Sequence, residues 1–257
     1  MSRRRYELTD FEWLIIRPLL PNKPRGVPRV DDRRVLNGIL WRFRTGSPWA
    51  DIPERYGPHT TCYNRFVRWR KAGVWDHLLE EVTKAYDGDI VMIDSSCVRV
   101  HQHGATAKRD QDDDCMGRSR GGLTTKIHAL VDDEGRPVGL ELSAGQAHDS
   151  TEAEELLEPL GEGAILLADK AYDSNAIRDF AAKRGAWANI PAKSNRKDDF
   201  LFSKWLYRQR NLVERFFNKL KRFRGIATRY DKNQLNFLAA IKLASVRIWL
   251  RSYESTA

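Results

Sequence analysis

The stretch "DIVMIDSSCVRV", residues 89–100, is where the sequence pattern changes from helix to strand. It is a short apolar run rich in β-branched residues, too short for a buried helix, and it therefore predicts a β-strand. Upstream, apolar residues recur at helical spacing, as in "DDRRVLNGILWRFRTG" (31–46). We therefore expect two domains, a helical domain over residues 1–86 and an α/β domain over residues 87–257.

Downstream of that strand, segments typical of strands and helices alternate. The sequence predicts a pair of strands over residues 124–145, a helix over 149–160, a strand over 163–173, a helix over 174–185 and a strand over 186–193. A hairpin followed by alternating α and β units gives a mixed sheet with helices on its faces. This order matches the ribonuclease-H-like fold, so the expected fold class is α/β with a mixed sheet flanked by helices.

The helical domain contains a candidate DNA-binding motif. "SPWADIPERYG" (47–57) predicts a short helix that ends at Gly57, and "PHTTCYNRFVRWRKAG" (58–73) predicts a second helix capped by Thr60 or Thr61. Two helices joined by a tight turn form a helix-turn-helix. The second helix would present basic side chains to the major groove and its phosphates: Arg65, Arg68, Arg70 and Lys71. The alternative is an ordinary small helical bundle with a basic face.

Charge is distributed unevenly along the chain. Residues 1–86, 87–192 and 193–257 have net charges of +7, −9 and +11, counting Lys and Arg against Asp and Glu. Two basic flanks around an acidic middle indicate surfaces that bind phosphate and a centre that needs carboxylates. The expected partner is double-stranded DNA.

Composition argues against a membrane or secreted protein. The most apolar stretch near the C-terminus, "AIKLASVRIWL" (240–250), is interrupted by Lys242 and Arg247, so we expect no membrane span. The basic N-terminal residues are not followed by an apolar stretch, so we expect no secretory signal. The three cysteines are scattered without C-x-x-C spacing, which favours a reducing cytoplasm over a zinc knuckle or a disulfide scaffold.

Two aspartates follow apolar runs in the α/β region. Asp94 follows Ile90–Ile93, and Asp169 follows Ile165–Ala168. If the two strands are parallel neighbours, the carboxylates lie side by side at the carboxyl edge of the sheet, where open sheets bind ligands. Two such carboxylates repel unless a hard divalent cation neutralises them. The alternative is that each aspartate simply caps the element that follows it.

A third acid stands alone in a basic segment. "YRQRNLVERFFNKLKRF" (207–223) has six basic residues around Glu214. At helical spacing, one narrow stripe holds Tyr207, Arg210, Glu214 and Lys221. The opposite side is apolar and should face a core, with Leu212, Val213, Phe216, Leu220 and Phe223. We interpret Glu214 as completing a metal site whose surrounding cations hold a polyanion; the alternative is a solvated basic helix with one compensating acid.

These motifs carry a family resemblance. The stripe has the pattern Y-x2-R-x3-E-x6-K, which resembles the signature of bacterial insertion-sequence transposases with a D-D-E active site. "GRSRGGLTTKIHALVD" (117–132), "GQAHDS" (145–150) and "LLADKAYDS" (166–174) resemble the insertion sequence five family in particular. The resemblance covers nearly the whole chain and implies a metal-binding catalytic triad of Asp94, Asp169 and Glu214.

The resemblance also implies the cofactor, the assembly and the cellular location. We expect two Mg²⁺ ions, with Mn²⁺ able to substitute, because a pair of metals can activate the attacking oxygen and stabilise the leaving one. Transposases act as multimers that pair two DNA ends, so we expect a homodimer or higher oligomer on DNA. The expected location is the bacterial cytoplasm, associated with the nucleoid when bound to DNA.

Further DNA contacts are predicted around the triad. Arg210 and Lys221 are expected to contact phosphates near the scissile bond. Tyr207 either packs on a sugar or phosphate or is a packing residue at the helix start. Lys126 and His128 alternate with Ile127 and so share one face of a strand; they point either to the active site or to a solvated sheet face.

The sequence therefore predicts a DNA transposase. It would bind the ends of its insertion sequence, cleave phosphodiester bonds as a metal-dependent endonuclease, and join the freed 3′-hydroxyl to target DNA. Two alternatives remain: a ribonuclease-H-like nuclease or resolvase without strand transfer, and a catalytically inactive DNA-binding regulator.

Overall fold

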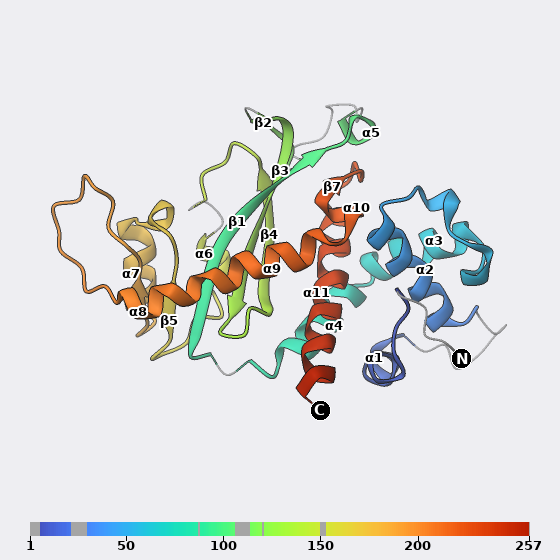
Figure 1. Ribbon diagram of the computed structural model, residues 1–257, viewed down its shortest axis with the longest axis horizontal. Helices are drawn as coiled ribbons and strands as arrows, with labels where there is room; N and C mark the ends of the chain where they lie inside the picture. Colours follow the sequence, from blue (N-terminus) through green and yellow to red (C-terminus); the bar gives the residue numbers. More distant parts are fainter. Residues whose placement is uncertain are drawn as a thin grey trace. The chain divides into compact units, whose positions relative to one another are not determined.

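The structure, a computed structural model, describes residues 6–21, 30–86, 88–105, 114–119, 121–149 and 153–256 (Figure 1). It divides into two compact units, one made of residues 1–82 together with 220–257, the other of residues 83–219. The C-terminal helices thus group with the N-terminal helices, whereas the sequence-based division placed residues 87–257 in one domain. That division at residue 86 stays a prediction.

The first unit is helical in its described part. Its α-helices are α1 (Asp10–Ile16), α2 (Asp32–Thr45), α3 (His59–Lys71), α4 (Val74–Thr83), α10 (Arg224–Ala227) and α11 (Gln234–Thr256), with a two-residue strand β7 (Thr228–Arg229). Helix α1 begins with a capping box, since the Thr9 hydroxyl accepts from the Glu12 amide and the Glu12 carboxylate accepts from the Thr9 amide. The buried carboxylate of Glu12 also forms an ion pair with Arg247 of α11. This unit is therefore built from both ends of the sequence.

The motif predicted around Gly57 differs from the expectation in detail. The element before Gly57 is a single turn of 3-10 helix, Glu54–Tyr56, and Gly57 follows it with a positive φ of 89°. Helix α3 begins at His59 with Pro58 in the N-cap position, so Thr60 and Thr61 lie inside the helix, and the predicted caps were wrong. Proline takes this place because its fixed φ suits the entry to a helix.

The second unit contains a mixed sheet. Its strands are β1 (Ile90–Val100), β2 (Gly117–Ser119), β3 (Gly122–Asp132), β4 (Pro137–Ala144), β5 (Ile165–Leu167) and β6 (Trp187–Asn189). Strand β3 is antiparallel to β1 on one side and to β2 and β4 on the other. On the far side of β1, β5 and then β6 run parallel to it. This arrangement of antiparallel and parallel strands confirms the expected ribonuclease-H-like sheet.

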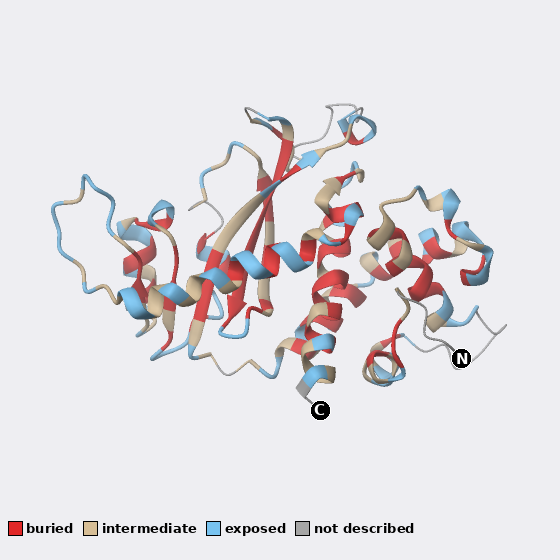
Figure 2. Cartoon of the chain, viewed as in Figure 1, coloured by how far each residue is buried: buried red, intermediate tan, exposed pale blue. Residues whose placement is uncertain are grey.

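Helices α6 (Ala153–Leu156) and α7 (Asn175–Lys183) cover one face of this sheet. Alternate residues of β1 and β5 point into the core beneath them, including Val91, Ile93 and Leu166. Figure 2 shows most of β3 and the first part of β1 as buried, whereas the second half of β1 is largely intermediate or exposed. Because side chains alternate along a strand, Met92 and Asp94 lie on the opposite face.

A helical segment of three consecutive parts crosses that opposite face: α8 (Lys204–Tyr207), a 3-10 turn (Arg208–Arg210) and α9 (Asn211–Lys221). The start of α9 lies against the turn between β3 and β4, where a Cβ added to Gly135 would come within 3.0 Å of the Leu212 carbonyl oxygen. Gly135 also has a positive φ of 71°, so this close approach and the turn both require glycine.

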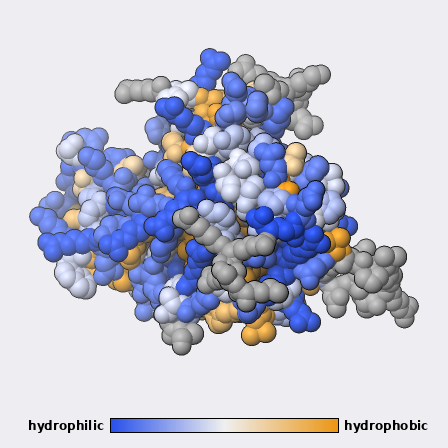
Figure 3. Space-filling model, turned by 45° about the vertical axis from the view of Figure 1, so that its right-hand side comes forward, coloured by the Kyte–Doolittle hydropathy of each residue, from blue (hydrophilic) through white to orange (hydrophobic). Residues whose placement is uncertain are grey.

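The surface in the view of Figure 3 is mostly hydrophilic, with hydrophobic residues in small separate patches. Within the part of the chain that the structure describes, every helix is too short or too polar to cross a membrane.

Candidate active site

The sheet register aligns the two predicted aspartates. Parallel strands β1 and β5 pair Met92 with Leu167, and Asp94 and Asp169 each lie two residues beyond that pair. Strand β5 ends at Leu167, whereas β1 continues to Val100, so Asp94 stands mid-strand where its parallel neighbour stops. The parallel pairing of these two strands, on which the expectation for the two aspartates depended, is present. Strand alternation places both carboxylates on the face away from the α6–α7 core.

The alternative capping role applies to one aspartate only. The Asp169 carboxylate accepts a 2.7 Å hydrogen bond from the Ala171 amide and so caps the 3-10 turn Lys170–Tyr172. Asp94 caps nothing, because its strand continues beyond it; its Oδ1 accepts a 2.8 Å bond from the adjacent Ser95 amide. Burial raises the pKa of Asp94, and the nearby Asp169 carboxylate adds to that rise. The ionised form of Asp94 therefore needs a cation.

Arg210 supplies that cation and brings the third acid to the site. Its Nη1 donates to Asp94 Oδ2 at 2.8 Å, and its Nη2 donates to Glu214 Oε1 at 2.6 Å. Although burial lowers the pKa of Arg210, the charge of Asp94 raises it overall, so the guanidinium stays protonated. One side chain thus links β1 to the crossing helix and places Glu214 beside the Asp94 carboxylate.

The crossing helix presents the predicted stripe. Glu214 is exposed while Val213 and Phe216 are fully buried, so the apolar side faces a core as expected. Leu212, expected in that core, is only half-buried. The Arg210 guanidinium carbon lies 5.8 Å from the centre of the Tyr207 ring. Tyr207 also packs against Phe202, with ring centres 5.4 Å apart, and Lys221 ends α9 about two turns beyond Glu214.

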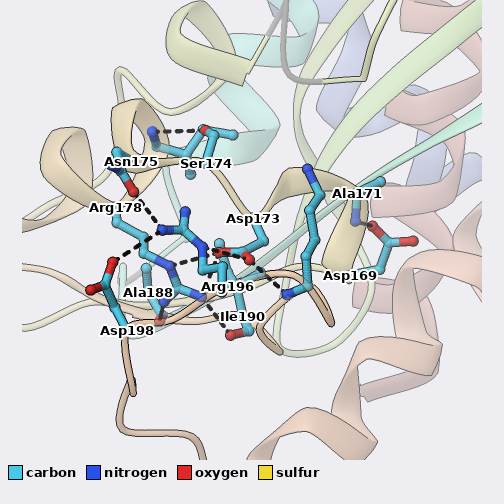
Figure 4. Close-up of polar contacts among 12 residues, drawn as sticks. Asp169, Ala171, Asp173, Ser174, Asn175, Arg178, Ala188, Ile190, Arg196 and Asp198 are labelled. Carbon is cyan, nitrogen blue, oxygen red and sulfur yellow. Dashed lines mark hydrogen bonds and ion pairs between the residues drawn. The ribbon is translucent and has the colours of Figure 1, made fainter.

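The turn that carries Asp169 is fixed by a buried ion cluster (Figure 4). The Asp173 carboxylate has no exposed area and accepts bonds from Arg178 Nε at 2.9 Å, Arg196 Nε at 2.8 Å and the Lys193 amide at 2.8 Å. Burial opposes ionisation, but the Lys193 amide and the two guanidinium groups together lower the pKa of Asp173. The cluster ties α7 and the segment after β6 to the residues that follow Asp169.

The three acids are candidate ligands for a metal ion. Among the described residues, no three His, Cys, Asp or Glu side chains are arranged to hold an ion as they stand. The donor set of Asp94, Asp169 and Glu214 is nevertheless all carboxylate oxygen, which suits Mg²⁺ or Mn²⁺. The Arg210 guanidinium already stands as a cation between two of these acids. In donor chemistry, though not in their present arrangement, these three residues therefore suit a divalent ion.

Lys126 and His128 lie on the α6–α7 face of the sheet, away from the three acids. Their predicted contact with DNA was therefore wrong. They share strand alternation with Leu130, which belongs to the α6–α7 core. Lys126 is buried, and its Nζ donates to the Ala147 carbonyl at 2.6 Å and to Asp149 Oδ1 at 2.8 Å. His128 is fully buried, 2.7 Å from Ser143 Oγ, and burial lowers the pKa of His128 to about 4.

The four predicted DNA-contacting residues of helix α3 differ in exposure. Arg65 is buried, pairs with Asp32 and lies over the Trp69 ring, so it holds the helix in place and does not face DNA. Arg70 is half-buried and donates to Asn233 Oδ1 at 2.8 Å. Arg68 and Lys71 are exposed, and their contact with DNA stays a prediction.

Sequence reasoning missed the residues that support the acids. Asp173 and Arg196 were not singled out, and neither was Ser95, whose hydroxyl binds Asp149. The stretches "LLADKAYDS" and "GQAHDS", which contain Asp173 and Asp149, had already been marked by the family resemblance. That resemblance was the available signal.

Two family models match the chain. Residues 85–249 match "Transposase DDE domain", and residues 8–79 match "Putative transposase of IS4/5 family". The first match covers well over half of the chain.

Individual relatives agree with these matches. A protein of Brucella ovis named "Putative transposase for insertion sequence element IS6501" is 38% identical over 130 residues, which cover 50% of this chain and 100% of the relative. "Uncharacterized protein y4sN" of Sinorhizobium fredii is 39% identical over 104 residues, covering 40% of this chain and 83% of the relative.

A solved structure is similar in fold. The piggyBac transposase in a synaptic complex with hairpin DNA matches with a TM-score of 0.52 at 10% identity, covering 96% of this chain and 71% of that chain. At this identity the likeness concerns the fold alone, and it agrees with the ribonuclease-H-like sheet. The family model over residues 85–249 leads to one conclusion: the chain belongs to the family of DDE-domain transposases.

Proposed function

We propose that this chain binds the ends of its insertion sequence, hydrolyses a phosphodiester bond at each end and transfers the freed 3′-hydroxyl to target DNA. The observation that carries this proposal is the meeting of acids from separate parts of the chain. Asp94 and Asp169 share one register and one face of the sheet, and Arg210 joins Glu214 to Asp94. A purely structural sheet gains nothing from three acids gathered in one place.

The proposed catalytic residues are Asp94, Asp169 and Glu214, acting as ligands of Mg²⁺ or Mn²⁺, with two ions the expected number. When bound, the ions would supply activation of the attacking oxygen and stabilisation of the leaving oxygen. The protein supplies fixed geometry: β1 holds Asp94, the Asp173 cluster holds the turn of Asp169, and α9 holds Glu214.

Basic residues near the acids are proposed to hold the DNA backbone. Arg210 offers a planar fork that matches phosphate, and Lys221 offers a point charge. Tyr207 lies beside Arg210 and can contact a sugar or phosphate. Residues 1–86 are proposed as the end-binding domain, with Arg68 and Lys71 of α3 as exposed phosphate contacts.

We also propose a homodimer or higher oligomer on DNA. Two ends of one element must be joined to one target, so two active sites have to be held together. The proposed location is the bacterial cytoplasm, on the nucleoid when DNA is bound.

Substitution of each acid tests the assignment. Asp94→Asn, Asp169→Asn and Glu214→Gln should each abolish cleavage of a labelled element end in Mg²⁺ and leave end binding in a mobility-shift assay nearly unchanged. Full cleavage by any one purified variant would remove that residue from the triad. A pre-cleaved labelled end then separates the alternatives: a transposase joins it to target DNA, a nuclease only nicks, and an inactive regulator does neither.

A further inference from the structure

A partly buried polar cluster lies directly behind the strand that carries Asp94. It consists of Ser95, Lys126 and Asp149, and we refer to it as the rear cluster. Asp149 Oδ1 accepts from the Ser95 hydroxyl at 2.6 Å and from Lys126 Nζ at 2.8 Å. Lys126 donates a further 2.6 Å bond to the Ala147 carbonyl. These bonds join β1, β3 and the segment after β4.

The rear cluster and the acids occupy opposite faces of the sheet. Ser95 pairs in register with His128 of β3, and its side chain points to the α6–α7 side, since its neighbour Asp94 points to the other. The cluster therefore does not contact a substrate bound at the acids. Its most direct link to Asp94 is β1, because Ser95 follows Asp94 in that strand and its amide bonds the Asp94 carboxylate.

The rear cluster lies just beyond the point where the pairing between β1 and β5 ends. The pairing with β5 ends at Met92, two residues before Asp94. At the next residue, the Ser95 amide bonds to the Asp94 carboxylate, and the Ser95 hydroxyl bonds to Asp149. Ser95 thus holds the Asp94 carboxylate with its backbone and is itself held by its side chain.

The bonds in the rear cluster are strong for their kind. The Lys126 and Asp149 side chains are 11% and 27% exposed, so water screens their attraction little. Bonds in which one partner is ionised are shorter and about twice as strong as neutral ones. Asp149 stays ionised because Lys126 and Ser95 lower the pKa of Asp149, although burial opposes this.

We propose that the rear cluster is a positioning device that fixes the Asp94 carboxylate in the geometry needed to bind a divalent ion. This inference rests on the proposed metal-binding role of Asp94. It assigns Ser95 and Asp149 a task for the reaction, beyond holding the sheet together. Partners that orient metal ligands typically change metal affinity by about 10- to 100-fold when removed.

Ser95→Ala is the sharpest test, because Asp149 keeps its ion pair with Lys126 in this variant. The readout is Mn²⁺ affinity, measured by calorimetry on the full chain without DNA. Ser95→Ala should weaken Mn²⁺ binding about tenfold, at the lower end of the range for such partners. Ser95→Thr keeps the hydroxyl and suits a strand, so it should bind within about twofold of the original chain.

Ser143→Ala is the matched control. It removes a serine hydroxyl on β4 that is more deeply buried than that of Ser95, and it leaves His128 without that partner. It should lower the thermal midpoint at least as much as Ser95→Ala and leave Mn²⁺ affinity unchanged. Equal weakening of Mn²⁺ binding by both variants would mean a general loosening of the sheet and would overturn the inference, as would unchanged binding by Ser95→Ala.

Asp94→Asn distinguishes a failure of the proposed metal site from a failure of the positioning role. If it does not weaken Mn²⁺ binding, the proposed metal site itself is wrong. If it does weaken binding and Ser95→Ala does not, the metal site stands and the positioning role of the rear cluster is wrong.

Discussion

Arg210 occupies the oxygens that a divalent ion would need, and its removal should therefore have two effects of opposite sign. In the DNA-free chain the guanidinium bonds both Asp94 and Glu214. Arg210→Ala frees these carboxylates, so the DNA-free chain should bind Mn²⁺ more tightly. With DNA present the same variant lacks the phosphate contact proposed for Arg210, so end binding and cleavage should both fall.

The size of the first effect follows from the geometry. A hydrogen bond to a charged group contributes about 1.5–3 kcal/mol. The bond to Asp94 counts at the lower end of that range, since the two side chains are 17% and 20% exposed. The bond to Glu214 adds little, because that side chain is 56% exposed and screened. A net release of about 1.4 kcal/mol corresponds to about tenfold tighter Mn²⁺ binding.

Calorimetry with Mn²⁺ on the DNA-free chain measures this directly. Arg210→Lys is the matched control, because one ammonium keeps the charge but lacks the fork that spans two acids. It should fall between the original chain and Arg210→Ala. On element-end DNA, loss of one phosphate contact should reduce the slope of log affinity against log salt by about 0.9. Unchanged or weaker Mn²⁺ binding by Arg210→Ala without DNA would refute the competition between the guanidinium and the ion.

Two further predictions concern residues whose expected roles the structure changed. His128 has a pKa of about 4 in the folded chain and an ordinary unfolded value of about 6.5, so the unfolded chain binds more protons between these values. Stability should therefore fall as the pH is lowered from about 6.5 to 4, by up to about 3 kcal/mol in urea unfolding, and His128→Gln should remove that part of the pH dependence. For DNA, Arg65→Met should lower stability and keep the salt slope, whereas Arg68→Ala should keep stability and lower the slope by about 0.9; the reverse pattern would contradict the burial of Arg65.

The two aspartates could be singled out because each follows an apolar run that is typical of a buried strand. Parallel neighbouring strands bring the residues after such runs to one part of the sheet, which holds here, although Asp94 does not end its strand. The sequence could not show that β1 continues to Val100 while β5 stops at Leu167, since that difference depends on partner strands. Glu214 was found because helical spacing separates its polar stripe from Val213 and Phe216.

The predictions for Lys126, His128 and Arg65 were wrong because the local sequence pattern does not determine which way these side chains face. Alternation shows that Lys126 and His128 share a face, but β3 is buried on both faces, so no apolar pattern tells which one. Arg65 sits among basic neighbours on α3, and only the position of Asp32 on α2 decides that it turns inward. Choices of this kind are settled by tertiary packing.

The division of the helical unit between residues 1–82 and 220–257 has a consequence for biosynthesis. Helix α1 buries the Glu12 carboxylate completely, and its guanidinium partner Arg247 is translated 235 residues later. Until α11 leaves the ribosome, that carboxylate has no such counter-charge and the apolar faces of α1 to α4 lack their final covering. We expect the nascent N-terminal helices to remain incompletely packed until α11 has been synthesised, which happens only after the intervening sheet has emerged.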